Sequence, residues 1–426
     1  MKILFAHPNF PGQFKHLVRH FAKKSKYEVV FITTHYNKQA PEGVKVILSK
    51  PNTPPKNSNS HQYLKSFEKS AYAAQSMWRI CNKLKESGFT PDVIYAHPGW
   101  GDGILLKDIF PDVPFIAYME FYYKAFGADV HFHPNSVVNP DRVARIRFKN
   151  ATNLLNLEAC DWAISPTHWQ TSLHPHEFHH KFSVIHEGID TDLLKPVKVK
   201  VDIQLPDGSK LPKNTEIVTY VARNFEPYRG FEQVMQSIEI LMKQRPKTHF
   251  LMIGNDGVSY GAKLANDKTY REKMLEELNL DESRLHWYGK LPFDKYTALL
   301  SHSMAHIYMT VPFVLSWSVL EAMSIGCPLV ASKTSPLFEV IKDNENALFA
   351  DFFRPEDIAQ KVSKLLDDES LRKKISKNGR KTIIQKYSIK KIWPTYEKLI
   401  TSIASGKINK DIVKRLKPKA IAASVE

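Results

Sequence analysis

Short apolar runs alternate with amphipathic stretches along almost the whole chain. In the first half, the runs with the length and composition of strands are KILFAH, YEVVFITT, VKVILS, PDVIYAH, PFIAYM, DWAISP and FSVIHEG. In the second half, the same pattern returns in EIVTYVA, HFLMIG, RLHWYG, HIYMT, PLVAS and ALFAD. Helical periodicity lies between several of these runs, for example over 61–87 and 139–160. Near-continuous apolar strands that alternate with helices predict an α/β fold with two doubly wound parallel sheets, one in each half.

One stretch, VPFVLSWSVLEAMSIGCPLVAS at 311–332, carries a single carboxylate, Glu321, among apolar and small residues. Ser316 is a suitable N-cap, residues 317–325 have the pattern of a short helix, and Gly326 is suited to a left-handed helix end. Apolar runs on both sides of this helix predict buried strands. The helix is therefore expected to begin at the carboxyl edge of a parallel sheet, where such folds bind ligands.

The length of 426 residues suits two domains. The polar stretch KPVKVKVDIQLPDGSKLPKNT, rich in Pro, Lys and Asp, predicts a linker at 196–215. This leaves one Rossmann-like domain at 1–195 and a second at 216–385. A helix at 386–405 and a loosely attached basic tail at 406–426 complete the predicted order.

The composition, with 43% hydrophobic and 24% charged residues, is that of an ordinary globular protein. The cysteines Cys81, Cys160 and Cys327 are far apart and lie inside apparent core elements, so we expect packing roles in a reducing compartment. The chain opens directly into a strand, and its apolar runs are shorter than the ~18 residues that span a bilayer. We expect a cytoplasmic protein.

The net charge of +16 comes from basic clusters at 15–26, 142–149, 372–381 and 407–419. One explanation is solvated helix faces, and another is a cationic face for anionic lipid head groups or a polyanionic substrate, with peripheral contact at the inner face of the membrane. The basic runs show no recognition motif and no pattern of stacking aromatics, so nucleic acid is not expected as a partner.

Two arginines follow the first strand of the second half. Arg223 lies at the end of EIVTYVA, and Arg229 lies six residues later at the start of the next predicted helix. Two guanidinium groups together with free helix N–H groups form a strong site for a diphosphate. The alternative is two surface arginines paired with Glu226 or Glu232.

Glu321 is expected one turn into its helix, behind the amides of residues 316–318. The helix amides around Ser316 and Ser318 would donate hydrogen bonds to phosphate oxygens. The Glu321 carboxylate has only acceptors and could accept hydrogen bonds from both hydroxyls of a ribose. The alternative is a buried carboxylate that binds local backbone N–H groups.

In the first half, three residues that follow strands are candidates. Gly12, in HPNFPGQF, allows a tight turn and a close approach of a ligand, or is a purely structural turn. His97 and Glu120 could bind an acceptor or a sugar, although a structural role for His97 stays open. The aromatic residues 121–123 could stack on a sugar or belong to the core. The histidines in HPHEFHH do not have a standard metal-ligand spacing, and no metal or other cofactor is expected.

These motifs resemble those of the retaining family 4 glycosyltransferases of the GT-B fold. The similar segments include ISPTHWQTSLHP, IHEGIDTDLLKP, ARNFEPYRGF and LEAMSIGCPLVAS, and AHPGWGD, MEFYY and PFVLSWSVLEAM resemble one bacterial subgroup. The resemblance implies two domains that face each other across a cleft, with C-terminal helices returning to the first domain. It also implies that the second domain binds a nucleotide-diphosphate sugar and the first binds the acceptor. By this resemblance Arg223 and Arg229 hold the diphosphate, Glu321 holds the ribose, and Gly12 belongs to the glycine loop near the diphosphate.

The sequence departs from the family pattern at two places. The first acid of the family's Glu-x7-Glu motif is replaced by Phe313, and the amides that would hold the transferred sugar come from Val314, Leu315 and Ser316. Sugar recognition is therefore expected to differ, with a less hydroxylated or modified sugar as one outcome. The histidine that the family commonly has after a first-domain strand is also replaced, and Glu120 is the candidate for its position.

The resemblance implies a transferase that retains anomeric configuration and acts in bacterial surface polysaccharide or lipid-linked glycan synthesis. The leaving diphosphate would be stabilised by the two arginines and would help to deprotonate the acceptor, and the loss of one such donor typically costs about a hundredfold in rate. Phe313 supports an alternative, a degenerate GT-B scaffold that binds glycan or protein. An epimerase or phosphorylase on the same fold is a further alternative, without a distinct feature in this sequence.

Overall fold

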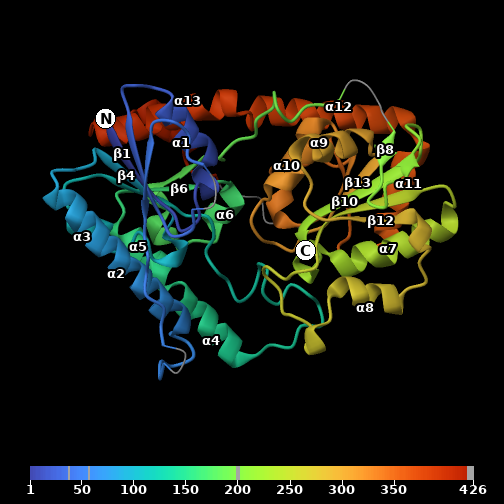
Figure 1. Ribbon diagram of the computed structural model, residues 1–426, viewed down its shortest axis with the longest axis horizontal. Coiled ribbons are helices and arrows are strands. Elements are labelled where there is room, and N and C mark those ends of the chain that lie inside the picture. Colours follow the sequence, from blue (N-terminus) through green and yellow to red (C-terminus); the bar gives the residue numbers. More distant parts are fainter. Residues whose placement is uncertain (37–38, 56–57, 198–201, 420–426) are drawn as a thin grey trace. The chain divides into compact units, whose positions relative to one another are not determined.

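The computed structural model describes residues 1–36, 39–55, 58–197 and 202–419. The chain forms two compact units (Figure 1). Unit 1 comprises Met1–Gly188 and Ile389–Glu426, and unit 2 comprises Ile189–Ser388. The chain thus leaves unit 1 after Gly188, earlier than the expected boundary at 195, and returns to it at Ile389.

Unit 1 contains, within its described residues, a seven-stranded parallel sheet in the order β3-β2-β1-β4-β5-β6-β7. Its strands are β1 (Lys2–Ala6), β2 (Glu28–Thr33), β3 (Val44–Leu48), β4 (Val93–Ala96), β5 (Phe115–Tyr118), β6 (Trp162–Ser165) and β7 (Phe182–Val184). Its helices are α1 (Lys15–Ala22), α2 (Lys65–Glu86), α3 (Leu106–Ile109), α4 (Pro140–Lys149), α5 (Ala151–Ala159), α6 (His168–Ser172), α13 (Ile389–Ala404) and α14 (Lys410–Leu416). The strand order reverses between β1 and β4, which is where such sheets open a crevice for ligands.

Unit 2 has the same architecture. The part of it that the structure describes holds a six-stranded parallel sheet in the order β12-β11-β10-β13-β14-β15. Its strands are β10 (Ile217–Asn224), β11 (His249–Asn255), β12 (Leu285–Tyr288), β13 (Ala305–Tyr308), β14 (Leu329–Ser332) and β15 (Leu348–Ala350). Its helices are α7 (Phe231–Gln244), α8 (Tyr270–Glu277), α9 (Phe293–His302), α10 (Trp317–Ile325), α11 (Pro355–Asp367) and α12 (Glu369–Lys386). Here the order reverses between β10 and β13.

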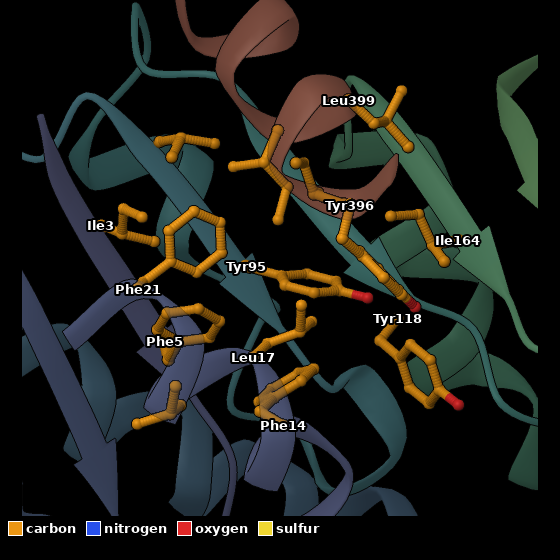
Figure 2. Packing of buried hydrophobic residues seen from close by; sticks show 14 of the residues in the cluster. Ile3, Phe5, Phe14, Leu17, Phe21, Tyr95, Tyr118, Ile164, Tyr396 and Leu399 are labelled. Atoms are coloured by element: carbon orange, nitrogen blue, oxygen red, sulfur yellow. The ribbon is translucent and has the colours of Figure 1, made fainter. Parts of the chain in front are cut away.

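Both faces of the unit 1 sheet are covered, because successive side chains of a strand point to opposite faces. Ile3 and Phe5 pack in a cluster with residues of α1 and α13, and Figure 2 shows part of this cluster, including Tyr396 and Leu399. Leu4 and the other side chains on the opposite face pack against α2, α3 and α5. Since both faces are buried, the strands show the continuous apolar runs from which they were predicted.

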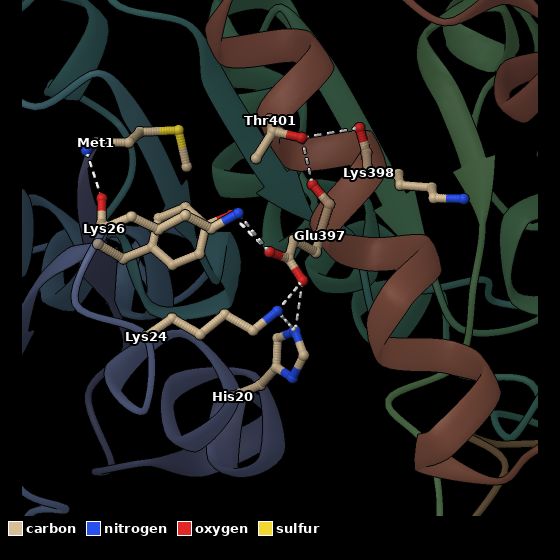
Figure 3. A network of polar contacts seen from close by, with 8 residues as sticks. Met1, His20, Lys24, Lys26, Glu397, Lys398 and Thr401 are labelled. Carbon is tan, nitrogen blue, oxygen red and sulfur yellow. Dashed lines mark hydrogen bonds and ion pairs between the residues drawn. The ribbon is translucent and has the colours of Figure 1, made fainter.

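Helix α13 joins the last part of the chain to the first. Glu397 accepts hydrogen bonds from Tyr27 (2.6 Å) and His20 (2.9 Å), and pairs with Lys24 and Lys26 (Figure 3). Burial by itself raises the pKa of Glu397, but the hydrogen bonds from these neighbours outweigh burial and hold that pKa well below its usual range. Part of the basic cluster at 15–26 therefore has an internal partner.

Two expectations about connecting segments are corrected. The stretch at 196–215 was expected to be a linker, but from residue 202 onwards it belongs to unit 2, with residues 198–201 outside the described ones. It forms the ribbon β8 (Ile203–Gln204) and β9 (Lys210–Leu211), and its apolar side chains pack in the core of that unit. The composition was polar, but a few well-placed apolar residues were enough to anchor the ribbon.

The expected loose tail at 406–426 also has a structure over part of its length. Residues 410–416 form α14, in which Asn409 is the N-cap and Ile412 is buried in the core of unit 1. The backbone N–H of Lys419 donates to Nδ1 of His168 (3.1 Å). Residues 420–426 lie outside the described part. Among the described residues, no helix is both long enough and apolar enough to cross a bilayer.

Candidate active site

A network of four polar side chains lies at the carboxyl ends of β1, β4 and β5 in unit 1. Nε2 of His7 is 2.7 Å from Oε1 of Gln13, and Nε2 of Gln13 donates to Oε1 of Glu120 (2.8 Å). Nε2 of His97 is 3.3 Å from Oε2 of Glu120. The structure thus brings together two residues predicted from the sequence, His97 and Glu120, and adds His7 and Gln13.

The backbone fixes the direction of the hydrogen bonds in this network. Nδ1 of His7 accepts from the N–H of Asn9 (2.9 Å), so Nε2 carries the proton and donates to the Gln13 carbonyl. Nδ1 of His97 likewise accepts from the N–H of Gly99 (3.2 Å), so its Nε2 donates to Glu120. Burial lowers the pKa of His7 to about 3, the neighbouring His97 acts in the same direction, and the His7 ring therefore stays neutral. All donors therefore lead to the Glu120 carboxylate, which is 23% exposed.

Gly12 is needed by this network for a steric reason. Its φ is +50°, and a Cβ at this position would lie 2.5 Å from Cε1 of His7. A side chain would therefore collide with the histidine ring. The predicted contact of Gly12 with a ligand stays a prediction.

The residues after Glu120 do not form the stacking surface that the sequence left open. Phe121 and Tyr122 are buried, and Tyr123 lies under the ammonium group of Lys149, 3.5 Å from its ring centre. These residues belong to the packing of unit 1.

In unit 2, Arg229 lies where the sheet order reverses. Its Nη1 donates to Oγ1 of Thr310 (3.2 Å), and its guanidinium carbon is 5.8 Å from the ring centre of Tyr260. Gly230 has a φ of +61°, and a Cβ there would lie 2.4 Å from Cβ of Met309. The turn between β10 and α7 is thus held close to the loop that follows β13. Arg223, at the end of β10, is exposed.

The alternative acidic partners of these arginines bind elsewhere. Glu226 is buried and Oε2 accepts from the N–H groups of Ser259 (3.1 Å), Tyr260 (2.9 Å) and Gly261 (3.0 Å). Glu232 pairs with Lys273. Over the described residues, no ion pair involves Arg223 or Arg229, so both cationic groups are available to an anion.

Helix α10 has the predicted limits. Ser316 is its N-cap and accepts from the N–H of Ser318 (3.3 Å), and Gly326 ends it at a φ of +82°. The half-buried Glu321 lies in the second turn and accepts from the hydroxyl of Tyr296 (3.3 Å). Burial, and then the charge of Glu321, raises the pKa of Tyr296.

The loop before α10 is apolar where the sequence departs from the family pattern. Phe313 is buried, and its ring centre is 4.9 Å from that of Tyr260 and 5.8 Å from that of Tyr228. Leu315 is also buried, whereas Val314 is partly exposed. The backbone N–H of Val311 donates to the carbonyl of Tyr228 (3.2 Å), which fixes the start of the loop beside Arg229.

The residues His7, Gln13, Tyr260 and Tyr296 were not among those predicted from the sequence. The position of His7 directly after a strand was a usable signal. Gln13 was not, because its partner Glu120 lies 107 residues away in the chain.

Two family models match the chain. The model described as "Glycosyl transferase family 4 group" matches residues 25–194, and the one described as "Glycosyl transferases group 1" matches residues 203–382. Among curated proteins, a D-inositol 3-phosphate glycosyltransferase of Corynebacterium glutamicum is 26% identical over 194 residues, which is 45% of either chain. The chain therefore matches less than half the length of that relative.

Solved structures are similar over nearly the whole chain. Anabaena Alr3699/HepE in complex with UDP has a TM-score of 0.65 at 15% identity, with 94% of this chain and 100% of that chain covered. The same protein is also known in complex with UDP-glucose. The sucrose-phosphate synthase of Thermosynechococcus elongatus has a TM-score of 0.69 at 16% identity, with 95% and 100% covered. At these identities the likeness shows the fold alone.

Proposed function

Since this chain belongs to the glycosyltransferases of the GT-B fold, we propose that it transfers a sugar from a nucleotide-diphosphate sugar to a hydroxyl acceptor and retains the anomeric configuration. The observation that carries the proposal is the group of donors in unit 2, where Arg229 lies beside the loop that leads to α10. The setting we propose is bacterial surface polysaccharide or lipid-linked glycan synthesis. The UDP and UDP-glucose complexes of the structural neighbour support a donor of this class.

The donor's diphosphate is assigned to Arg223, Arg229 and the first N–H groups of α10. An arginine binds phosphate oxygens through two parallel N–H groups, and the positive end of a helix dipole adds to this attraction. Glu321 would accept from the ribose hydroxyls, while the amides of Val314, Leu315 and Ser316 would hold the transferred sugar. Two guanidinium groups supply the charge that a metal ion would otherwise provide, so we expect activity without a metal.

The transfer exchanges one carbon–oxygen bond for another. The bond between the anomeric carbon and the diphosphate breaks, and its electron pair leaves with the diphosphate oxygen. The acceptor oxygen forms the new bond on the same face of the sugar, and its proton passes to the leaving diphosphate. The products are a glycoside and a nucleoside diphosphate. Negative charge grows on the leaving oxygen, and the arginines and helix N–H groups stabilise it there.

On the acceptor side, we assign the Glu120 network of unit 1 to the hydroxyl that reacts. Glu120 accepts from Gln13 and His97 and its side chain is partly exposed, so an acceptor hydroxyl can reach the carboxylate and donate to it. His97 and the neutral His7 hold that carboxylate in place. The role of Glu120 is to orient the hydroxyl, and the diphosphate takes the proton.

Peripheral binding to an anionic membrane is part of the proposal. Every residue of α4 is at least partly exposed, and Arg142, Arg145 and Arg147 lie on its open surface. Val137, just before this helix, is 88% exposed. Cations next to an exposed apolar side chain suit a bilayer surface. The protein should co-sediment with vesicles that contain phosphatidylglycerol and not with pure phosphatidylcholine vesicles.

The test of the donor assignment is a thermal-shift panel of nucleotide-diphosphate sugars with different bases and sugars. A ligand at a hundred times its Kd stabilises the unit that binds it by about 2.7 kcal/mol, which corresponds to a rise of roughly 5–10 °C in the Tm of a unit the size of unit 2 (Ile189–Ser388). We expect one nucleotide class to give such a rise in Tm. NMR then follows the transfer of the sugar from that donor and shows the anomeric configuration of the product. A panel without any stabilising nucleotide and without donor hydrolysis would falsify the proposal.

A further inference from the structure

Trp100 is a large aromatic side chain that lies open to solvent beside the polar network of unit 1. Its side chain belongs to the short turn Pro98–Trp100 that follows β4, and the residue is 44% exposed. Its ring centre is 4.7 Å from that of His97 and 5.3 Å from that of His7. The indole is tilted by 42° to the ring of His97 and by 55° to that of His7, so it packs against both histidines of the Glu120 network, at the place where the strand order reverses.

The segment that carries Trp100 is fixed by close packing. Gly101 has a φ of +101°, and a Cβ there would lie 2.3 Å from the backbone oxygen of Ser70. A Cβ at Gly103 would lie 2.2 Å from Oδ1 of Asn156. The N–H of Gly101 donates to the carbonyl of Pro98 (3.1 Å). Because the turn is tightly packed, the position of Trp100 is set before a ligand arrives. Little conformational entropy is therefore lost at this residue on binding.

A flat aromatic face next to a carboxylate matches the chemistry of a pyranose ring. The axial C–H groups of such a ring form an apolar face, while its hydroxyl groups at the edge donate hydrogen bonds. The indole offers apolar surface, and Glu120, which is in contact with His97 (3.3 Å), offers acceptor oxygens. A lipid phosphate or a small polyol such as glycerol would leave the indole unused.

We propose that Trp100 is the platform on which a pyranose ring of the acceptor stacks, with ring hydroxyls bound by Glu120, so that the acceptor hydroxyl belongs to a sugar residue. This inference rests on the proposed function and specifies its acceptor class. It also assigns the aromatic contact to Trp100, while the neighbouring residues Phe121 and Tyr122 are buried.

The chain provides a matched control. Trp78, on α2 of the same unit, is exposed to a similar extent, 39%, but lies on a helix and away from the carboxyl edge of the sheet. Trp78→Ala removes the same amount of side chain from the surface. Trp100→Phe keeps a smaller aromatic face, and Trp100→Ala removes it.

The experiment titrates the full chain with the methyl pyranosides of glucose, galactose, mannose and N-acetylglucosamine, and with glycerol, while the heat of binding is followed by calorimetry. We expect a saturable change with at least one pyranoside and none with glycerol. The affinity should fall about tenfold or more in Trp100→Ala, fall less in Trp100→Phe, and stay unchanged in Trp78→Ala. Melting temperatures show that each variant is folded.

Two results would overturn the inference. One is wild-type protein that gives no saturable change with any of the pyranosides, and the other is equal pyranoside affinity in Trp100→Ala and Trp78→Ala. Stabilisation by nucleotide-diphosphate sugars is measured on the same wild-type sample. Its presence without pyranoside binding contradicts the inference alone, whereas its absence contradicts the proposed function.

Discussion

Replacing Arg229 by alanine should slow the departure of the diphosphate far more than the same change at Arg223. Arg229 is half-buried and held by Thr310 and Tyr260, so its guanidinium is already in place when charge develops. Two unit charges 4 Å apart attract by about 4 kcal/mol at an effective dielectric constant of 20. The loss of one preorganised donor costs about 3–4 kcal/mol in measured cases, which is about 100-fold to 1,000-fold in kcat.

Arg223 is exposed, so water and salt screen its charge and its side chain must be ordered by the ligand. The two arginines could not be ranked from the sequence, whereas their different exposure in the structure ranks them. We expect a loss of about tenfold in Arg223→Ala and an intermediate loss in Arg229→Lys, which keeps the charge but not the paired N–H groups.

The assay is donor hydrolysis or transfer with the nucleotide sugar that stabilises the protein most in the thermal panel. Initial rates at saturating donor give kcat, and calorimetry with the matching nucleoside diphosphate gives Kd. Unchanged kcat and Kd in Arg229→Ala, with an unchanged melting temperature, would refute the diphosphate assignment. A larger loss in Arg223→Ala than in Arg229→Ala would refute the argument from burial.

Three further outcomes are expected. Glu321→Gln should weaken nucleoside diphosphate binding about tenfold and leave the 2′,3′-dideoxy analogue unaffected, which calorimetry measures; equal losses for both ligands contradict a ribose contact. Glu397→Gln should destabilise the fold by about 1–2 kcal/mol at pH 7. Because the folded-state pKa of Glu397 lies below the unfolded value, its carboxylate stabilises the fold above that unfolded value, and the contribution is lost as the pH falls through the folded pKa. Urea unfolding of both proteins should therefore converge in acid, and a constant difference would rule out the ion-pair origin. Gly12→Ala should cost about 1–3 kcal/mol in urea unfolding, since its Cβ meets the His7 ring; a neutral result would mean that the ring moves aside freely.

The regular elements were predictable from the sequence because their signals are local. A helix over 317–325 followed from Ser316 and Gly326, and the structure confirms both its start and its end. The strands followed from apolar runs, since a strand buried on both faces has little room for polar residues. The two sheets and their parallel pairing are confirmed.

Features that depend on packing between distant segments were not predictable in this way. The ribbon within 196–215 is anchored by Ile203, Leu205 and Leu211, whose burial cannot be inferred from a polar average. In the same manner, one buried side chain, Ile412, attaches α14 to unit 1.

The candidate site was predictable as a set of residue types and not as a geometry. Arg223, Arg229 and Glu321 were found because they follow strands at the edge where ligands bind. The hydrogen-bond order that connects His7 to Glu120 needed the structure, since backbone contacts decide which ring nitrogen carries the proton. The exposed position of Trp100, beside buried aromatic neighbours, could not be inferred from its place in the motif.

The position of α13 has a consequence for how the protein is made. Tyr396, Leu399 and Ile400 complete one face of the sheet that begins at Lys2, and the hydroxyl of Tyr396 donates to the carbonyl of Ile185 (3.0 Å). During translation the first strand is therefore synthesised almost four hundred residues before the helix that covers it. Until then the aromatic face around Phe5 is open to water and to chaperones, and the half of the protein that is synthesised first is the half that must wait to finish folding.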